Sequence, residues 1–205
     1  IHTYLPDFAP VTKVIEETPN IKSYQVVFND PEKMKTFKYE PGQVGQLSVF
    51  GVGESTFVIN SPPTRMDYLQ FSVMKVGEVT SVLHELHEGD QIGVRAPLGN
   101  WFPYEDMKGK KILFIGGGIG LAPLRTLILF MLDNRADYGD ITILYGSRTP
   151  PDLCYKDDLN EWEARSDVNL ILTVDNEYPG WNKRTGFVPT VLNEIAPSPE
   201  GTIAI

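Results

Sequence analysis

The sequence contains very little cysteine: Cys154 is the single one among 205 residues. One cysteine excludes a disulfide within the chain, and it excludes any iron–sulfur cluster or zinc ion held by cysteines of this chain alone. We therefore expect a reducing, cytoplasmic location. Histidine is scarce too, and the neighbouring His84 and His87 have no third ligand close to them, so no metal site is predicted.

Positive charge and long apolar segments are also in short supply. The chain has 18 Lys and Arg against 27 Asp and Glu, a net charge of -9. Nucleic acids and anionic membranes both select basic surfaces, so neither is predicted as a partner. The longest apolar stretch, 119–132, is interrupted by Pro123 and Arg125, and a membrane helix needs about 20 apolar residues. We predict no membrane insertion and see no signal peptide pattern.

Glycine and proline are plentiful, with 18 and 16 residues, and they divide the first hundred residues into short apolar segments. These segments are rich in β-branched and aromatic residues, which is the pattern of a six-stranded antiparallel barrel. One helix is predicted at 81–86, with Thr80 as its N-cap. The predicted strands are 11–15, 21–28, 44–50, 56–60, 69–76 and 91–95.

The second half of the chain alternates between apolar strands and amphipathic helices, which predicts a doubly wound parallel sheet. We divide the chain into a β-barrel domain, 1–104, and an α/β domain, 105–205. Residues 202–205 have the pattern of a further buried strand, so we expect the second domain to be truncated at its C-terminal end. The predicted strands are 111–116, 141–146, 168–174 and 202 onward, and the predicted helices are 119–133, 156–165 and 188–195.

The most informative stretch is a turn after the first strand of the α/β domain, with glycines at 116, 117, 118 and 120. Glycine lets the backbone turn sharply and lets a pyrophosphate approach the N–H groups at the start of the next helix. Pro123 stands where the usual dinucleotide motif has its third glycine, and the strand 141–145 is followed by Gly-Ser-Arg instead of an acidic residue. Nucleotide binding is the preferred interpretation, and a glycine turn used only for packing is the alternative.

Five short motifs follow one another along the chain: Pro41-Gly42-Gln43, Gly77-Glu78-Val79-Thr80, Ala96-Pro97-Leu98-Gly99-Asn100, the glycine turn with Leu121-Ala122-Pro123-Leu124, and Tyr145-Gly146-Ser147-Arg148 with Asp152-Leu153. Their order and spacing resemble the ferredoxin–NADP reductase superfamily, and within it the electron-transfer subunits of dihydroorotate dehydrogenase and the gamma subunits of sulfhydrogenases. The resemblance covers almost the whole chain. It implies that the barrel binds FAD, that the α/β domain binds NAD, and that hydride passes between the stacked rings.

The flavin segment of that superfamily has the form Arg-x-Tyr-Ser, and the aligned residues here begin at Ser55. Phe57 is suited to stack on the isoalloxazine. Val58 has no side-chain donor, so the flavin N5 would rely on a backbone N–H, on Asn60 or on Ser61. An ordinary core strand is the alternative interpretation. The resemblance assigns flavin binding to Thr56, Phe57, Val58, Ile59, Asn60, Met74, Lys75, Gly77, Val79, Thr80, Ser81 and Gly99.

The segment from Gly77 to Ser81 opens a predicted helix and is the expected seat of the FAD pyrophosphate. The hydroxyls of Thr80 and Ser81 would donate to it, although Thr80 as a simple helix cap is an open alternative. Lys75 or Arg65 would replace the missing arginine of the flavin motif.

Nicotinamide dinucleotide binding is assigned by the resemblance to Gly117, Gly118, Ile119, Gly120, Pro123, Gly146, Ser147, Arg148 and Asp175. Arg148 would bond a phosphate, or the adenine and ribose. Asp175 would accept from a free 2′-hydroxyl and repel a 2′-phosphate, so NAD is preferred. NADP is the alternative, for which Lys183 and Arg184 argue. No catalytic residue is predicted, because hydride transfer between the two cofactors needs no general base.

The resemblance implies an electron-transfer subunit that passes hydride between NAD(H) and FAD and relays electrons to or from iron–sulfur partner subunits, in a hydrogenase or heterodisulfide-reductase-like complex. Any iron–sulfur cluster lies outside these residues, because one cysteine cannot hold it. Two alternatives remain open. One is an NADPH-specific reductase, and the other is a non-catalytic docking or assembly subunit whose flavin site has degenerated at Ser55 and Val58.

Overall fold

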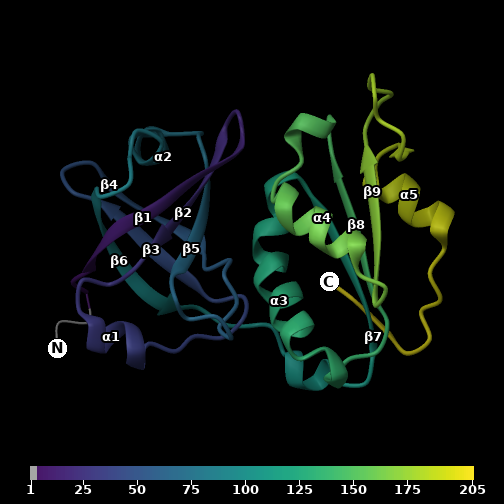
Figure 1. Cartoon of the computed structure of the whole chain (residues 1–205), viewed down its shortest axis with the longest axis horizontal. Helices are drawn as coiled ribbons and strands as arrows, with labels where there is room; N and C mark the ends of the chain where they lie inside the picture. The colour runs from purple at the N-terminus through teal and green to yellow at the C-terminus, as the bar shows by residue number, and fades with distance from the viewer. Residues whose placement is uncertain (1–3) are drawn as a thin grey trace.

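The computed structural model describes residues 4–205, which form two domains side by side. Figure 1 shows a β-barrel at the left and a layered α/β domain at the right, with α3 of the second domain facing the barrel. No helix within residues 4–205 combines the length and apolar character that crossing a membrane requires.

The barrel is a six-stranded antiparallel sheet in the order β4-β3-β6-β1-β2-β5, as predicted. Its core is formed by side chains that alternate inward along the strands, and Leu47, Phe71 and Val94 are completely buried there. The predicted first strand is shorter than β1, because β1 continues through a bulge to its turn with β2. The strands are β1 (Asp7–Thr18), β2 (Ile21–Val26), β3 (Val44–Val49), β4 (Gly53–Val58), β5 (Leu69–Met74) and β6 (Gln91–Leu98).

Two short helices accompany the barrel. The sequence analysis misses α1 (Pro31–Thr36), although Asp30 caps it by accepting from the Glu32 N–H at 2.9 Å. Such an acidic N-cap followed by proline is a helix start signal. The other helix, α2, spans Glu78–Leu83 and has Gly77 in the N-cap position. The predicted cap at Thr80 was therefore wrong, because that residue lies inside the first turn.

The connection between the domains runs from β6 to the first strand of the α/β domain and contains a 3-10 turn, Tyr104–Met107. Met107 is buried in the core of the α/β domain, and Tyr104 packs against the same core. The proposed boundary between 104 and 105 falls inside this turn.

The α/β domain has a parallel sheet in the order β10-β9-β8-β7-β11. Figure 1 shows α3 and α4 on the sheet face turned toward the barrel and α5 on the opposite face, which is the predicted doubly wound arrangement. Only the two-residue β10 has no counterpart in the prediction. The strands are β7 (Lys111–Gly117), β8 (Ile141–Ser147), β9 (Val168–Val174), β10 (Arg184–Thr185) and β11 (Thr202–Ala204), and the helices are α3 (Leu121–Asp133), α4 (Lys156–Ala164) and α5 (Val188–Ile195).

Helix α3 starts two residues later than predicted, because Gly118–Gly120 forms a 3-10 turn before it. The helix lies between the sheet and the barrel, and this is why most of its side chains are buried, including Arg125 and Thr126. Helix α3 therefore has the glycine turn at its N-terminal end and contacts the barrel with its side chains.

Candidate functional site

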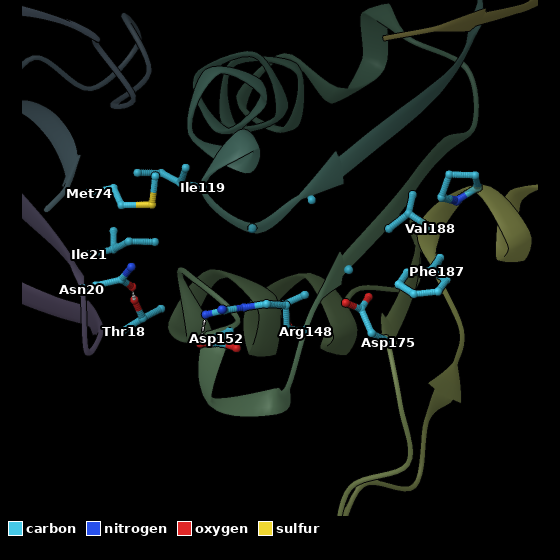
Figure 2. Close-up of a pocket in the computed structure, with 15 residues that line it drawn as sticks. Thr18, Asn20, Ile21, Met74, Ile119, Arg148, Asp152, Asp175, Phe187 and Val188 are labelled. Atoms are coloured by element: carbon cyan, nitrogen blue, oxygen red, sulfur yellow. Dashed lines mark hydrogen bonds and ion pairs between the residues drawn. The ribbon is translucent and has the colours of Figure 1, made fainter. Parts of the chain in front are cut away.

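A cleft of about 480 Å³ opens between the domains at the carboxyl ends of the parallel strands (Figure 2). The barrel forms one wall through the β1–β2 turn and the end of β5, and the α/β domain forms the other. In doubly wound sheets, ligands bind at this edge, beside the strand where the strand order reverses. Here that strand is β7.

Strand register explains how residues far apart in sequence meet in this cleft. Gly117 of β7 pairs with Gly146 of β8, and Ser147 pairs with Val174 of β9. The next residue, Asp175, donates its N–H to the Ser147 carbonyl at 3.1 Å. The structure thus brings these predicted residues to the cleft: Gly117, Gly118, Ile119, Gly146, Ser147, Arg148 and Asp175.

The glycines of the cleft serve two different purposes. Gly118 has φ +52, and no atom beyond its chain neighbours lies within 4 Å of a Cβ placed on it or on Gly120, within the part of the chain that the structure describes. A side chain at Gly118 would fill the space that a phosphate group needs. At Gly146, by contrast, a Cβ would meet Val188 Cγ2 at 2.5 Å and Thr173 Cγ2 at 2.9 Å. Gly146 is therefore required by packing against α5.

The loop after β8 is held in place by its own hydrogen bonds. Asp152 accepts from Thr149 Oγ1 at 2.9 Å and from Arg148 at 3.3 Å. Ser147 Oγ donates to the Thr149 carbonyl at 2.6 Å, so its hydroxyl hydrogen is already used. The Arg148 side chain is 76% exposed.

Asp175 and Phe187 lie together at the end of the cleft away from the barrel (Figure 2). Phe187 occupies the N-cap position of α5 and is 59% exposed, which is unusual for a large aromatic side chain. Together the two residues offer an apolar face and a carboxylate, which suit a nucleoside.

Several lining residues were not predicted as site residues: Thr18, Asn20, Ile21, Asp152, Phe187, Val188 and Pro189. The first three lie at the turn between β1 and β2, and no local pattern there indicates a contact with another domain, whereas Asp152 was noted only as part of a motif. Figure 2 shows Ile21 and Met74 of the barrel opposite Ile119, which gives the cleft an apolar mouth. Phe187 carried a usable signal, an aromatic residue directly before a Val-Pro helix start.

Comparisons with known proteins agree with this geometry. Residues 114–205 match the oxidoreductase NAD-binding domain family. Sulfhydrogenase 1 subunit gamma of Pyrococcus furiosus is 35% identical over 195 residues, covering 94% of this chain and 66% of that protein. An electron transfer subunit described as that of dihydroorotate dehydrogenase B (NAD(+)) of Methanocaldococcus jannaschii is 37% identical over 153 residues, covering 74% of this chain and 52% of that protein. The chain belongs to the ferredoxin–NADP reductase superfamily.

The fold is shared with solved structures. A crystal structure of a ferredoxin NADP+ reductase from Neisseria gonorrhoeae with bound FAD and NADP has a TM-score of 0.78 at 17% identity, covering 96% of this chain and 82% of that one. The resemblance seen in the motifs is confirmed, and the chain contains the NAD-binding domain of an oxidoreductase. The chain spans about half to two thirds of the length of the two curated relatives.

The superfamily's flavin segment falls on β4, whose residues here lie in different environments. Thr56 is exposed, and Phe57 and Val58 are partly buried. Val58 packs toward the core of the α/β domain, as does Met74 of β5. Val58 and Met74 therefore lie at the junction between the domains, whereas Phe57 packs on the barrel core. The flavin contacts of all four residues stay predictions.

Two residues assigned to the flavin from this segment do not face the cleft. Ile59 is completely buried in the barrel core, and its N–H donates to the Gln43 carbonyl at 3.0 Å. Asn60 is also fully buried, and its side-chain Nδ2 lies 2.6 Å from Ser72 Oγ and 3.1 Å from the Tyr155 hydroxyl. Both side chains are enclosed by other parts of the chain, and their assignment to flavin binding stays a prediction.

In the segment predicted to hold the FAD pyrophosphate, some polar groups form hydrogen bonds with one another. The Thr80 hydroxyl accepts from the N–H groups of Val76 and Gly77 at 3.0 and 2.8 Å and donates to the Gly77 carbonyl at 3.0 Å. The Thr80 hydroxyl hydrogen thus has an acceptor within the turn, and its donation to a phosphate stays a prediction. A Cβ placed on Gly77 meets nothing within 4 Å among the described residues, so a ligand has room to approach the backbone there.

The remaining predicted residues near the flavin have mixed positions. Lys75 is exposed beside Gly77, whereas Arg65 pairs with Asp133 of α3 at 2.6 Å and is no substitute for the missing flavin arginine. Val79 packs on the barrel core. Ser81 is partly buried and Gly99 is exposed, with φ +76, and their assignments stay predictions.

Gly120 and Pro123 do not line the cleft, although both belong to the predicted nucleotide turn. Gly120 is exposed and ends the 3-10 turn, and Pro123 is partly buried in the first turn of α3. Proline suits that place because an N–H there has no partner within the helix. The assignment of Gly120 and Pro123 to nucleotide binding stays a prediction.

Metal-binding side chains are not gathered anywhere in residues 4–205: no group of three or more His, Cys, Asp and Glu is arranged to hold an ion. His84 is buried, and its ring nitrogen lies 2.8 Å from the Val73 carbonyl. It belongs to the barrel.

Proposed function

We propose that this protein is a flavoprotein electron-transfer subunit that passes hydride between NAD(H) and FAD. The observation that carries the proposal is the cleft itself. One wall of the cleft is the end of the parallel sheet with its open glycine turn. The other wall is the barrel, which carries the superfamily's flavin segment. Two dinucleotides bound to these walls would have their reactive rings at the same junction.

For NAD, the chain offers a phosphate cradle and a nucleoside end. The open backbone at Gly118 and the start of α3 suit the pyrophosphate, since helix N-termini favour anions. Arg148 is exposed beside the cleft and would contact a phosphate by leaving its pairing with Asp152. Asp175 and Phe187 would receive the adenosine half, with the carboxylate accepting from the 2′-hydroxyl and repelling a 2′-phosphate.

For FAD, the residues that fit are Phe57 and Val58 for the ring, and the backbone at Gly77 with Lys75 and Ser81 for the pyrophosphate. When bound, FAD accepts two electrons as hydride and releases them singly. This chain would stack, orient and shield the rings, because hydride transfer requires no acid or base from the protein. Val58 gives the flavin edge an apolar neighbour where the superfamily motif has serine.

We also propose iron–sulfur subunits as the partners of this chain and a cytoplasmic complex as its setting. The two curated relatives are a gamma subunit and an electron transfer subunit, which supports assembly with other chains. Cys154 is buried, and burial raises the pKa of its thiol to about 11, so it is poorly suited to bind metal or react. One-electron carriers would therefore lie outside these residues.

Reconstitution tests the proposal. We expect the purified protein to bind FAD, to show flavin absorption near 450 nm, and to lose that absorption when NADH is added without oxygen. A protein that stays colourless after incubation with FAD would contradict the proposal and favour a non-catalytic docking subunit. A flavoprotein that only NADPH reduces would contradict the assignment of NAD.

A further inference from the structure

Behind the cleft, the two domains are joined by a buried polar network. At its centre, Arg125 of α3 forms an ion pair with Asp158 of α4 through two nitrogens, and its third nitrogen donates to the Asn60 carbonyl at 2.8 Å. The next residue, Thr126, donates to the Ser61 carbonyl at 2.8 Å. The backbone directly after β4 is thus held by α3.

Tyr155 reaches into the barrel from the other side of this contact. It precedes α4 with φ 55, a conformation that side-chain-bearing residues rarely adopt. Its hydroxyl donates to Ser72 Oγ at 2.8 Å and accepts from Asn60 Nδ2 at 3.1 Å. The Arg125 guanidinium lies 5.1 Å from the centre of its ring. Burial, chiefly, raises the pKa of Tyr155, so the hydroxyl keeps its proton.

Glu17, at the end of β1, completes the network from the barrel. One carboxylate oxygen accepts from Ser23 Oγ at 2.7 Å, and the other accepts from the Tyr155 N–H at 2.7 Å. Lys156 donates to the Glu17 carbonyl at 2.9 Å. Three barrel strands, β1, β2 and β5, and the segment after β4 therefore meet one loop and two helices, α3 and α4, of the α/β domain.

Such a network costs desolvation energy and is weak evidence for stability as such. Burial lowers the pKa of Arg125, but the charge and hydrogen bonds of Asp158, together with the nearby tyrosines, raise it by more, so the guanidinium stays charged. The directional bonds of this network permit one relative placement of the domains, whereas domain interfaces of ordinary polarity allow motion. That placement fixes the distance between the glycine turn, at the start of α3, and Val58, two residues before Asn60.

We propose that Tyr155 and Arg125 are positioning residues for hydride transfer: they set the separation between the flavin strand and the nucleotide turn without touching either cofactor. The inference rests on the proposed function. Small errors in the approach of reacting groups are costly, because a misplacement of about 1 Å can lower a rate about a hundredfold. Removing one bond of several should have a smaller effect.

The test uses Tyr155→Phe, which keeps the ring and removes the hydroxyl, and Arg125→Lys, which keeps the charge and loses the fork of donors. The matched control is Tyr24→Phe. The Tyr24 hydroxyl is buried and donates to the Leu83 carbonyl at 2.7 Å, entirely within the barrel domain. All three variants are compared with the wild type as purified chains.

Two measurements are made. Stopped-flow absorbance at 450 nm should show flavin reduction at saturating NADH slowed about tenfold in Tyr155→Phe and Arg125→Lys, with FAD content and the Kd for NADH within about twofold of wild type. Hydrogen exchange on the FAD-free protein should show the amides of 59–61 and 154–156 exchanging about fivefold faster in both variants. Tyr24→Phe should change neither.

The outcomes separate the possibilities. If Tyr155→Phe is reduced at the wild-type rate, or if Tyr24→Phe slows reduction as much, the positioning role is overturned and the proposed function stands. Unchanged exchange in both variants also overturns it, because the network then does not hold the domains. If NADH fails to reduce FAD-loaded wild type, both ideas fall, which distinguishes the two failures.

Discussion

Gly118 stands at the point where β7 ends and the cleft begins, and its backbone lies in the left-handed region. Gly118→Ala should cost about 1 kcal/mol of unfolding free energy and weaken NADH binding at least about tenfold, because the new methyl group projects into the cradle. Urea unfolding and NADH titration measure the two effects. Gly109→Ala, at φ +72 with open space in the domain connection, should lose similar stability and keep its NADH affinity. Equal losses of affinity in both variants would contradict the cradle.

Asp175 is the residue on which the preference for NAD depends. Asp175→Ser should raise the ratio of kcat/KM for NADPH over NADH by about tenfold, because a carboxylate that repels the 2′-phosphate is removed. Asp140→Ser, an exposed aspartate of the same domain, should leave the ratio unchanged. A ratio that does not move in Asp175→Ser would place the adenosine elsewhere.

At the scale of elements, the barrel loop before β5 is joined to the end of α3. Arg65 and Thr64 donate to Asp133. Burial raises the pKa of that carboxyl, and these bonds lower it by more, so it lies below its usual value. A lowered pKa gives stability that is present above the unfolded pKa, near 4, and lost as the pH falls through the folded value.

Asp133→Asn should therefore lower the unfolding free energy by about 0.5 kcal/mol at pH 7, a small amount because solvent screens the partly exposed pair. The difference from wild type should shrink toward zero below pH 4. Urea unfolding at pH 7 and at pH 3 measures it. A difference of the same size at both pH values would show that the effect does not come from the charge.

Local sequence patterns predicted an element well where that same pattern determines the element's structure. Alternating apolar residues gave the six barrel strands, and the strand with its glycine turn gave β7 and α3. The prediction failed at the boundary between β5 and α2. Helix α2 starts three residues before the predicted start, and the Gly77 N–H donates to the Thr80 hydroxyl in its first turn. Helix propensities of single residues do not predict that hydrogen bond.

At the scale of the whole molecule, what the sequence could not predict is how the domains meet. Asn60 and Tyr155 are 95 positions apart, and Asn60 and Arg125 are 65 apart. Asn60 follows the flavin motif, so a local interpretation turns it toward the flavin, but the partner domain takes up its side chain. The barrel wall of the cleft, which includes Asn20 and Ile21, could not be predicted either, because it too depends on how the domains meet.

The central claim is that both dinucleotides bind at the seam between the domains, close enough for hydride to pass directly. The most direct test is the primary isotope effect on flavin reduction with NADH carrying deuterium at C4. We predict that reduction at saturating NADH slows by a factor of about 2 or more with one C4 isomer and hardly at all with the other, because a single face of the nicotinamide meets the flavin. Reduction at the same rate with both isomers, or no reduction of the FAD-loaded protein, would contradict the account.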